Sequence, residues 1–531
     1  MTPPPSRAST SAGRAVGIDL GTTNSVVAVI DRDGAPRILT TEEGSTMLPS
    51  LVWYSPHGPV VGEAAREGLD HSPDLTIFGA KRLLGRRFDH PDIRKLARVL
   101  PYELTEAPNG DTWIQLAAGR AVSPEEVSAL ILRELRRTAE KFFGEPVTRA
   151  VITIPAWYDA AQRQATKDAA QIAGFHVMRL LSEPTAAALG HGAHRGADRR
   201  YLVCDLGGGT FDVAAVDVDA GVFEVLATTG DAFLGGDDVD RALVENLVRD
   251  VRSSRGIDVS TDAIAIEKLR LGAQRTKHEL SEHPIAKLQI KDLAQLPSGK
   301  ALEYSRAIRR DEVELWASPL IKRLEPPIKE ALRRCARKRE DLEEVLLVGG
   351  GTRMPAVRKE LARITGREPS VIANPEEVVA VGAALEVARL DGVIDGILLI
   401  DVAARGLMIS RQGQDCEIVV AQSSVVPTRE HKLLPTRHDD QVRVEFDLWE
   451  GESPDPSVNR HLGRYAVVDL PEAPAGDVLV LVEVTIDTDG VIRLGATELV
   501  SGDRVTLEQV YHAGLARADV ARLQKQLAEA S

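Results

Sequence analysis

Short apolar runs alternate with longer stretches of helical period over the first three quarters of the chain. The apolar run 150–154 precedes a helical pattern at 159–173, and a helical pattern at 325–339 precedes the apolar run 345–348. Strands that alternate with helices in this way predict an α/β architecture.

The hydrophobic period changes to two from about residue 405 to residue 510. The segment 442–448 alternates inward and outward residues, and the run 478–486 is followed by a turn at 487–490 and a further strand. Because such alternation is typical of strands, this region is predicted to be all-β.

Three segments lie outside these two regions. An apolar run at 396–401, bounded by Asp395 and Asp401, is as compatible with a core strand as with a separate role. Residues 515–528 show the pattern of one amphipathic helix. The first 14 residues are rich in Pro, Ser and Thr and are predicted to form a disordered tail.

A weak internal repeat links two distant parts of the α/β region. Segments 16–23 and 202–210 each contain an apolar strand, then Asp-Leu-Gly, then Gly or Thr, and each is followed by a second apolar strand. Each copy predicts a hairpin with a turn of small residues. Two copies in one region indicate two similar lobes, each of which presents such a turn.

The residues of the two turns suit phosphate. Glycines at the tip leave backbone N–H groups uncovered, and the hydroxyls of Thr22, Thr23 and Thr210 add donors. Asp19 and Asp205 precede the turns and would repel phosphate directly. Two carboxylates across a triphosphate would instead suit hydrated Mg²⁺, which keeps several of its waters. One turn alone could be an ordinary glycine hairpin, whereas the pair favours a nucleotide site.

Other motifs carry weaker signals. The chain has no GxxxxGK[ST] P-loop. The strand–Gly–helix turn at 349–353 could bring backbone against a nucleotide or could serve packing alone. The two histidines of 278–283 are one residue too far apart to share a helical face as in a zinc protease. The basic run 333–339 is most simply a solvated helix face.

Composition excludes several classes of protein. The 531 residues carry a formal net charge of −14, with 43% hydrophobic and 27% charged residues. These are ordinary globular values, and the acidic balance argues against a nucleic-acid partner. Cys204, Cys335 and Cys416 lie far apart and favour neither a disulfide framework nor a zinc site. Because no apolar run reaches the length of a membrane span, no membrane partner is expected and a cytoplasmic location is predicted.

Six motifs occur in order along the chain. They are Gly17–Asn24 (GIDLGTTN), Val151–Ala156 (VITIPA), Glu183–Ala188 (EPTAAA), Asp205–Asp212 (DLGGGTFD), Leu234–Gly236 (LGG) and Val348–Pro355 (VGGGTRMP). Together they resemble the DnaK-type (heat-shock protein 70) chaperone family over about residues 15 to 515. The ordered set is highly specific, although one element alone would also suit actin or sugar kinases, which share the ATPase fold.

The resemblance implies a fold of class α/β plus all-β. Its expected parts are a tail at 1–14, a two-lobed actin-like ATPase domain at 15–391, an interdomain linker at 392–404, a β-sandwich substrate-binding domain at 405–510 and a short helix at 511–531. Family members continue into a helical lid, whereas this sequence stops at Ser531. Fast peptide exchange is therefore expected in both nucleotide states.

Resemblance also implies a catalytic set of Asp19, Lys81, Glu183, Asp205 and Thr210. The three carboxylates would hold the water shell of Mg²⁺, and Lys81 would orient the attacking water, a division that suits phosphoryl transfer. Asp212, with Asp19, would bind K⁺. The expected contacts to ATP are Gly21, Thr22, Thr23, Gly207, Gly208, Gly209, Gly236 and Gly349, together with Lys277, Ser281, Gly350 and Arg353 near the adenosine.

Coupling between the two domains is a further implication. In the family the apolar linker docks on the ATPase domain with ATP and comes free after hydrolysis. The matching residues are Leu398, Leu399 and Ile400 in the linker, Pro155 and Arg163 in the relay from the γ-phosphate, and Arg179 and Asp401 where the linker couples to a J-domain co-chaperone. A nucleotide exchange factor is another expected partner.

The β-sandwich of the family holds an extended apolar peptide in a groove with one central pocket. Here the candidate pocket residues are Ile409, Leu434, Val442 and Val444, with Val482 less certain. The expected arch over the peptide falls at Gln412 and Arg437. Other departures from the family pattern are Gln274, Glu376 and Ser182, where we expect altered nucleotide affinity rather than lost binding.

These arguments predict an ATP-dependent molecular chaperone in which ATP hydrolysis controls linker docking and peptide affinity. Two alternatives come from other classes of protein. A sugar-kinase-like enzyme would need an acceptor pocket and would phosphorylate a small substrate. A nucleotide-binding interaction scaffold would show little or no ATP turnover, so single-turnover hydrolysis separates it from the chaperone.

Overall fold

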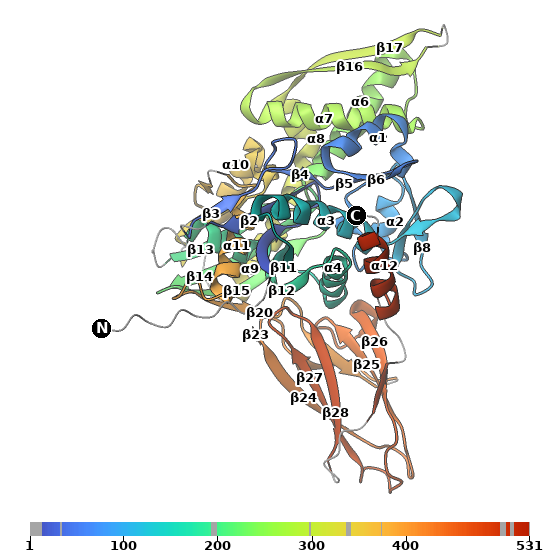
Figure 1. Ribbon diagram of the computed structural model, residues 1–531, viewed down its shortest axis with the longest axis vertical. Coiled ribbons are helices and arrows are strands. Elements are labelled where there is room, and N and C mark those ends of the chain that lie inside the picture. Colours follow the sequence, from blue (N-terminus) through green and yellow to red (C-terminus); the bar gives the residue numbers. More distant parts are fainter. Residues whose placement is uncertain are drawn as a thin grey trace.

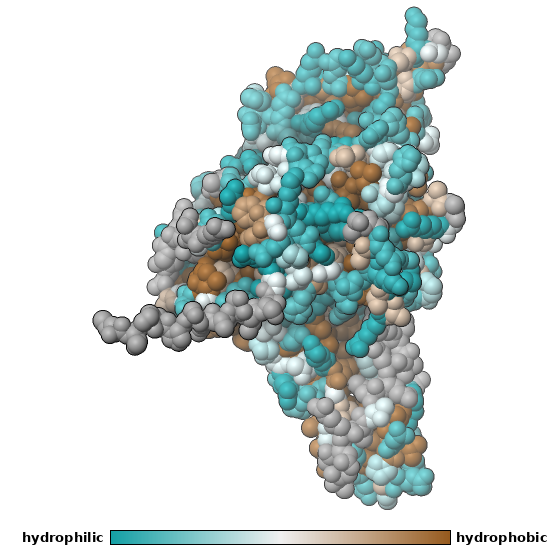
Figure 2. Space-filling model, viewed as in Figure 1, coloured by the Kyte–Doolittle hydropathy of each residue, from teal (hydrophilic) through white to brown (hydrophobic). Residues whose placement is uncertain are grey.

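The computed structural model describes residues 13–31, 34–192, 199–296, 299–335, 341–372, 374–411, 413–499, 506–509 and 514–529. Figure 1 shows a large body of helices and sheets with the strands β24 to β28 gathered in a second body beneath it. On the face drawn in Figure 2, hydrophilic residues cover most of the larger body and apolar residues form separate patches. The chain therefore divides into two parts, each of which buries its own apolar residues.

One sheet forms the centre of what we call lobe I. Its strands run in the order β12 (His176–Ser182), β11 (Val147–Ile154), β1 (Arg14–Asp19), β2 (Asn24–Ile30) and β3 (Pro36–Ile38), and β4 (Leu48–Pro49) pairs with β2. Pairing is parallel between β1 and β11 and antiparallel between β1 and β2, so the first repeat is a hairpin as predicted. Helices α3 (Pro124–Phe143) and α4 (Ala160–Ile172) pack against strands of this sheet.

Smaller elements extend lobe I. One small sheet has the strand order β6 (Gly58–Val61), β5 (Leu51–Ser55) and β7 (Thr76–Phe78), and another has the order β10 (Ala121–Val122), β9 (Thr112–Gln115) and β8 (Glu103–Glu106). The other elements are the helices α1 (Arg66–His71) and α2 (Pro91–Leu96) and the short 3-10 turn η3 (Ala80–Arg82). The turn η3 matters most for function, because it carries Lys81. It begins after Gly79, whose φ of +67° lies in the left-handed region that favours glycine.

A second sheet forms the centre of lobe II. Its strands run in the order β19 (Ser370–Val371), β18 (Glu344–Val348), β13 (Arg199–Leu206), β14 (Phe211–Asp219), β15 (Val222–Asp231), β20 (Leu398–Val402) and β23 (Val425–Val426). The antiparallel pair β13–β14 is the second predicted hairpin. The further elements of lobe II are α6 (Gly236–Arg255), α7 (Ala263–Glu282), β16 (Ile285–Gln295), β17 (Ala301–Arg309), α8 (Arg310–Lys322), α9 (Glu325–Arg334) and α10 (Pro355–Thr365).

Two apolar helices join the lobes. Helices α5 (Glu183–Gly192) and α11 (Val378–Leu390) pack against each other, and between them they contact strands of both sheets. Gly17 of β1 shows how close this packing is, because a Cβ there would lie 2.2 Å from the backbone nitrogen of Ala384 in α11. The two lobes consequently share a packed base, and a cleft opens above it.

The second body is a sandwich of two antiparallel sheets. One contains β22 (Glu417–Val420), β21 (Leu407–Ser410), β25 (Val444–Glu450), β26 (Arg460–Val467) and β29 (Leu507–Gln509); the other contains β24 (Thr428–Pro435), β27 (Leu479–Ile486) and β28 (Ile492–Glu498). Alternate residues of β27 are buried, in agreement with the predicted period of two. The predicted strand at 442–448 is shifted, because β25 begins only at Val444.

The apolar run 396–401 connects the two bodies as a strand. Strand β20 pairs in parallel with β15 of lobe II, and its last two residues pair with β23. Leu399 is only 8% exposed and belongs to the apolar cluster between the lobes, whereas Leu398 on the other face of the strand is 51% exposed. The run is thus a core strand and a connection between the bodies at the same time.

The last helix lies on lobe I. Helix α12 (Arg517–Glu529) contacts α4, and Val520 and Leu523 join the apolar core of that lobe. It follows the predicted helix 515–528 closely. At the other end Arg14 already belongs to β1, so the tail prediction was too long, and residues 1–12 lie outside the described residues. Residues 336–340 of the predicted helix 325–339 also lie outside them. No helix within the described ranges has the length and hydropathy of a membrane span.

Candidate functional site

A cleft of about 640 Å³ lies between the two lobes. Its lining includes Asp19, Gly21, Thr22, Thr23, Lys81, Glu183, Asp205, Gly207, Gly208, Thr210, Gly236, Lys277, Ser281, Gly349, Gly350 and Arg353. The fold therefore brings together the predicted catalytic and nucleotide-contacting residues, which lie far apart in the sequence. Two predicted residues do not line the cleft, namely Gly209 and the cation ligand Asp212.

The glycine turns of the two hairpins face each other across the cleft. A Cβ at Gly208 would lie 1.8 Å from the hydroxyl oxygen of Thr23, so only glycine fits where the turns meet. The second turn closes on itself through a hydrogen bond of 3.0 Å from the Gly207 nitrogen to the Thr210 carbonyl. Two turns that face one another with uncovered backbone donors can hold phosphate groups from both sides.

Three carboxylates gather beneath the turns. Asp19 ends β1, Glu183 begins α5 and Asp205 lies in β13. Glu183 and Asp205 are each 6% exposed, and Asp19 is half-buried. Burial and repulsion from Glu183 raise the pKa of Asp19 to about 7. Burial and repulsion from Glu183 and Asp212 raise the pKa of Asp205 well above its usual value. Such crowded negative charge suits a dication.

A metal at this place would be held through water. Among the described residues, no group of three or more His, Cys, Asp and Glu side chains is arranged to hold a metal ion. Mg²⁺ commonly keeps several waters and uses few protein ligands, so spaced carboxylates with perturbed pKa values fit a hydrated ion. The donor set here therefore fits Mg²⁺ bound with a nucleotide.

Lys81 is buried beside the carboxylates. Its ammonium lies 2.5 Å from the Oε1 atom of Glu183, and the side chain is 6% exposed. Burial disfavours the charged form, but attraction to Glu183, Tyr158 and Asp19 outweighs it and raises the pKa of Lys81. The Tyr158 hydroxyl donates a hydrogen bond of 3.1 Å to the Lys81 carbonyl and so fixes the backbone of η3. A fixed positive charge thus points into the cleft.

Asp212 lies deeper than the other carboxylates. One carboxylate oxygen accepts a 2.7 Å hydrogen bond from the Ala156 nitrogen, and the other oxygen has no hydrogen-bond partner within the described part of the chain. Burial and repulsion from Glu183 raise the pKa of Asp212 to about 8. A buried carboxylate oxygen without a partner fits a monovalent cation such as K⁺.

The other end of the cleft contains the predicted adenosine contacts. Lys277 donates 2.9 Å and 2.8 Å hydrogen bonds to the Gly236 carbonyl and to Asp240. Arg353 pairs with Glu376 at 2.8 Å, so this departure from the family pattern keeps an acidic partner for the arginine. Gly349 has a φ of +79°, and a Cβ there would lie 2.5 Å from an Asp205 oxygen. The turn at 349–353 therefore serves the cleft and not packing alone.

Acidification is expected to weaken binding of Mg²⁺ with a nucleotide. Asp19 and Asp212 have pKa values of about 7 and about 8, so both become neutral as the pH falls through these values. Their lost negative charge removes attraction for the cation, and affinity should fall by roughly tenfold or more between about pH 8.5 and about pH 6. Calorimetric titration of Mg·ADP at several pH values measures this. Asp19→Asn should flatten the profile, and an affinity that rises on acidification would contradict the assignment.

The two bodies meet along α4. The Arg163 guanidinium donates a 2.9 Å hydrogen bond to the Asp489 carbonyl, while the Asp489 carboxylate pairs with Lys167 and accepts a 3.0 Å hydrogen bond from the Leu180 nitrogen. Asp489 lies in the tight turn between β27 and β28. The sequence predicted this turn, but no local signal indicated that it would contact α4.

The other predicted coupling residues take different places. Pro155 is buried directly after β11, in the segment that leads to α4. Arg179 donates a 2.7 Å hydrogen bond to Glu386 in α11 and forms no ion pair with Asp401 among the described contacts. The guanidinium attracted to Asp401 is that of Arg163. The linker aspartate therefore faces the relay arginine in this arrangement.

The predicted peptide-binding residues do not share one environment. Ile409, Leu434 and Val444 are at most 3% exposed in the core of the sandwich, whereas Val442 is 45% exposed ahead of β25. The expectation that all four line one pocket therefore does not match this arrangement. Of the two arch positions, Arg437 bonds to the Gln414 side chain, and Gln412 lies outside the described residues.

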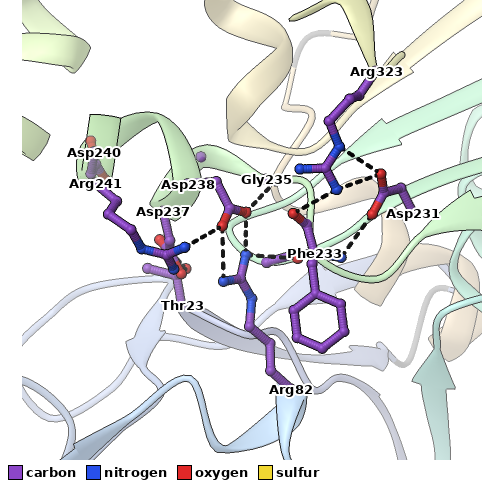
Figure 3. Close-up of polar contacts among 12 residues, drawn as sticks. Thr23, Arg82, Asp231, Phe233, Gly235, Asp237, Asp238, Asp240, Arg241 and Arg323 are labelled. Atoms are coloured by element: carbon purple, nitrogen blue, oxygen red, sulfur yellow. Dashed lines mark hydrogen bonds and ion pairs between the residues drawn. The ribbon is translucent and has the colours of Figure 1, made fainter. Parts of the chain in front are cut away.

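Sequence reasoning missed one group of residues in and beside the cleft. Arg82 follows Lys81 directly and pairs with Asp238 in α6, and the Thr23 hydroxyl lies 3.3 Å from Asp237 (Figure 3). Both contacts join lobe I to lobe II. The only sequence signal was the pair of acidic residues after Leu234–Gly236, which could equally have been a helix N-terminus with favourable charges.

Comparison with known proteins agrees with the geometry. A family model described as "Hsp70 protein" matches residues 15–531. A curated relative named "Mitochondrial-type heat shock protein 70", from Encephalitozoon cuniculi (strain GB-M1), is 40% identical over 508 residues, which cover 96% of this chain and 85% of the relative.

The name of this relative contradicts the predicted cytoplasmic location. That prediction was wrong, because it rested on two features that do not distinguish the cytoplasm from an organelle. The lack of an apolar run argues only against a secretory leader or a membrane span, and sparse cysteines are compatible with any reducing compartment. The family model matches nearly the whole chain, and the relative is aligned with 96% of it. The chain belongs to the Hsp70 family and is an ATP-dependent molecular chaperone.

Proposed function

We propose that this chain itself hydrolyses ATP to ADP and phosphate in the cleft between its lobes. The observation that carries the proposal is the position of Lys81, a buried ammonium 2.5 Å from Glu183 and close to two facing phosphate turns. Phosphoryl transfer needs positioning and charge neutralisation more than covalent chemistry. Members of the Hsp70 family are ATPases, and the family match over residues 15–531 supports the same activity here.

The residues would divide the work as follows. Asp19, Glu183 and Asp205 would hold Mg²⁺ through its waters, and the ion would supply charge neutralisation at the phosphates. Lys81 would orient the attacking water and offset charge on the γ-phosphate. Asp212, with Asp19, would bind K⁺. The turn residues Thr22, Thr23 and Thr210 and their neighbouring backbone N–H groups would fix the phosphates.

Nucleotide would control the second body through the linker and α4. We place the ATPase domain at 15–391, the linker at 392–404, the sandwich at 405–510 and a terminal helix at 511–531. The pairing of β20 with β15 and the contacts of Asp489 with α4 support a docked state in which both bodies touch lobe residues. Because docking and nucleotide binding share one equilibrium, peptide must influence ATP as much as ATP influences peptide.

The partners follow from this scheme. The chaperone binds unfolded polypeptides, and the sandwich is their proposed site, through Ile409, Leu434, Val442 and Val444. Apart from Val442, these side chains are buried, so a peptide could reach them only if the strands around them move. A J-domain co-chaperone near Arg179 and Asp401 and a nucleotide exchange factor on the lobes are the other proposed partners.

Single-turnover hydrolysis tests the proposal. A stoichiometric complex of the protein with radiolabelled ATP is isolated. The release of phosphate is then followed in two samples, one with Mg²⁺ and one with a chelator. The proposal expects phosphate to form at the same first-order rate at which ATP disappears, and to form only in the sample with Mg²⁺. ATP that stays intact while tightly bound would favour the alternative of a nucleotide-binding scaffold. The sugar-kinase alternative has lost its support, because the family match covers the sandwich as well as the lobes.

A further inference from the structure

Arg82 connects lobe I to lobe II beside the cleft. It lies in η3 next to Lys81, and its guanidinium contacts both oxygens of Asp238 at 2.5 Å and 3.3 Å. The same guanidinium donates a 2.8 Å hydrogen bond to the carbonyl of Gly209. Figure 3 shows the Arg82 guanidinium facing the Asp238 carboxylate. One side chain thus holds an α6 carboxylate and a phosphate turn of the opposite lobe together.

Asp238 in turn orders the neighbouring loop. Its carboxylate accepts a 2.9 Å hydrogen bond from the Gly235 nitrogen, at the start of α6. Because Gly236 lines the cleft beside the phosphate turn, the Arg82–Asp238 pair connects three backbone segments around the phosphate site. The side chains of Arg82 and Asp238 are 4% and 5% exposed. An ion pair so well removed from water is costly to separate, since the buried Arg82 guanidinium would lose its carboxylate partner, whereas Asp238 would keep Arg241 at 3.3 Å.

The ion pair of Lys81 behaves differently. Its partner Glu183 begins α5, so that pair does not by itself hold the two hairpin turns together. Arg82 is the next residue along the chain, and its position therefore determines where η3 lies relative to the glycine turns of lobe II. If Arg82 loses its partners, Lys81 can remain paired while its distance to a nucleotide on lobe II changes.

We propose that Arg82 is a positioning residue that clamps the two lobes over the nucleotide. Its pairing with Asp238 and Gly209 keeps the cleft closed, slows nucleotide release and holds Lys81 against the phosphate turns. The Thr23–Asp237 contact lies beside the clamp and is weaker, because both of its distances exceed 3.2 Å. This inference rests on the proposed function where it concerns hydrolysis, but the effect on nucleotide release does not depend on it.

The test is a double-mutant cycle on nucleotide release. Labelled fluorescent ADP is bound to the full chain and chased with excess ADP for Arg82→Met, Asp238→Asn and the double variant. Each single change should speed release by roughly tenfold, and the double variant should be no faster than the faster single one, because both remove the same contact. Release at the rate of the unchanged protein, or effects that multiply in the double variant, would overturn the clamp.

Two further variants control for folding and for charge. Arg241 also lies 3.3 Å from Asp238, but it sits on the same helix and cannot bridge the lobes, so Arg241→Met should release ADP at the normal rate. Arg82→Lys keeps the charge without the fork that reaches Asp238 and Gly209 together, and its release rate should be intermediate. Should Arg82→Met fail to fold, an Arg82→Lys variant with unchanged release would still refute the proposal.

Hydrolysis by the same variants separates the two proposals. In single-turnover assays Arg82→Met should lower the hydrolysis rate while Lys81 remains in place. If the unchanged protein leaves ATP intact but releases ADP more slowly than Arg82→Met does, the proposed hydrolysis is refuted and the clamp is supported. Normal hydrolysis by the unchanged protein, together with unaltered release and hydrolysis by Arg82→Met, would refute the clamp alone.

Discussion

The Lys81→Ala variant is expected to bind ATP and to hydrolyse it very slowly. The ammonium lies among the carboxylates that would surround the metal, and attraction to Glu183 keeps it charged. Removal of one preorganised charge that acts on the transition state lowers the rate by roughly a hundredfold to a thousandfold. Binding should change far less, because the phosphate turns and the adenosine contacts remain. Single-turnover phosphate release and equilibrium ATP titration measure the two quantities separately.

A surface lysine provides the matched control. Lys268 on α7 bonds to the Asp292 carbonyl at 2.7 Å, away from the cleft, so Lys268→Ala should hydrolyse ATP normally. Turnover that survives Lys81→Ala unchanged would show that another group orients the water. Equal loss of binding and turnover would mean that Lys81 serves ground-state affinity instead.

Leu399→Asp is expected to disconnect the two bodies. Leu399 is 8% exposed within the apolar cluster between the lobes, and β20 holds it there by pairing with β15. Burial of an unpaired carboxylate costs several kcal/mol, so the docked state should lose population by on the order of a hundredfold or more. Peptide should then no longer alter the rate of ATP hydrolysis, although the basal cleft chemistry persists. The ratio of hydrolysis rates with and without an extended apolar peptide measures the coupling.

The neighbouring leucine makes this prediction specific. Leu398 lies on the same strand and is 51% exposed, so Leu398→Asp leaves its new charge in water and should retain much more of the coupling. If both variants lose coupling equally, the charge of the linker matters rather than burial of Leu399. If neither loses it, the pairing of β20 with β15 is not the path between the bodies.

Local patterns predicted the parts of the site that repeat or follow a strand. Asp19 and Asp205 each precede a glycine turn, so the hairpins and their carboxylates could be predicted from short segments. Lys81 required the resemblance, because nothing in its own segment distinguishes it from another surface lysine. Arg82 and Asp238 could not be predicted, since they are 156 residues apart and belong to different lobes.

Boundaries and contacts between the bodies were harder to predict for the same physical reason. Val442 continues the alternating pattern of the strand that follows, but it lies outside β25 and is exposed. The turn that carries Asp489 has an ordinary local signature, whereas its contact with Lys167 depends on how two separately folded bodies meet. Periodicity records burial within an element and carries no information on such docking.

Amide hydrogen exchange of β20 tests the central claim most directly. The Leu398 nitrogen donates a 3.0 Å hydrogen bond to the Gly221 carbonyl of lobe II, so exchange of the linker amides reports docking itself. Lys81→Ala holds the protein in the ATP state, and ADP supplies the other state. The account predicts amides of residues 398–402 that are protected with ATP and exchange freely with ADP. Equal protection in both states would contradict it, because hydrolysis would then leave the linker where it was.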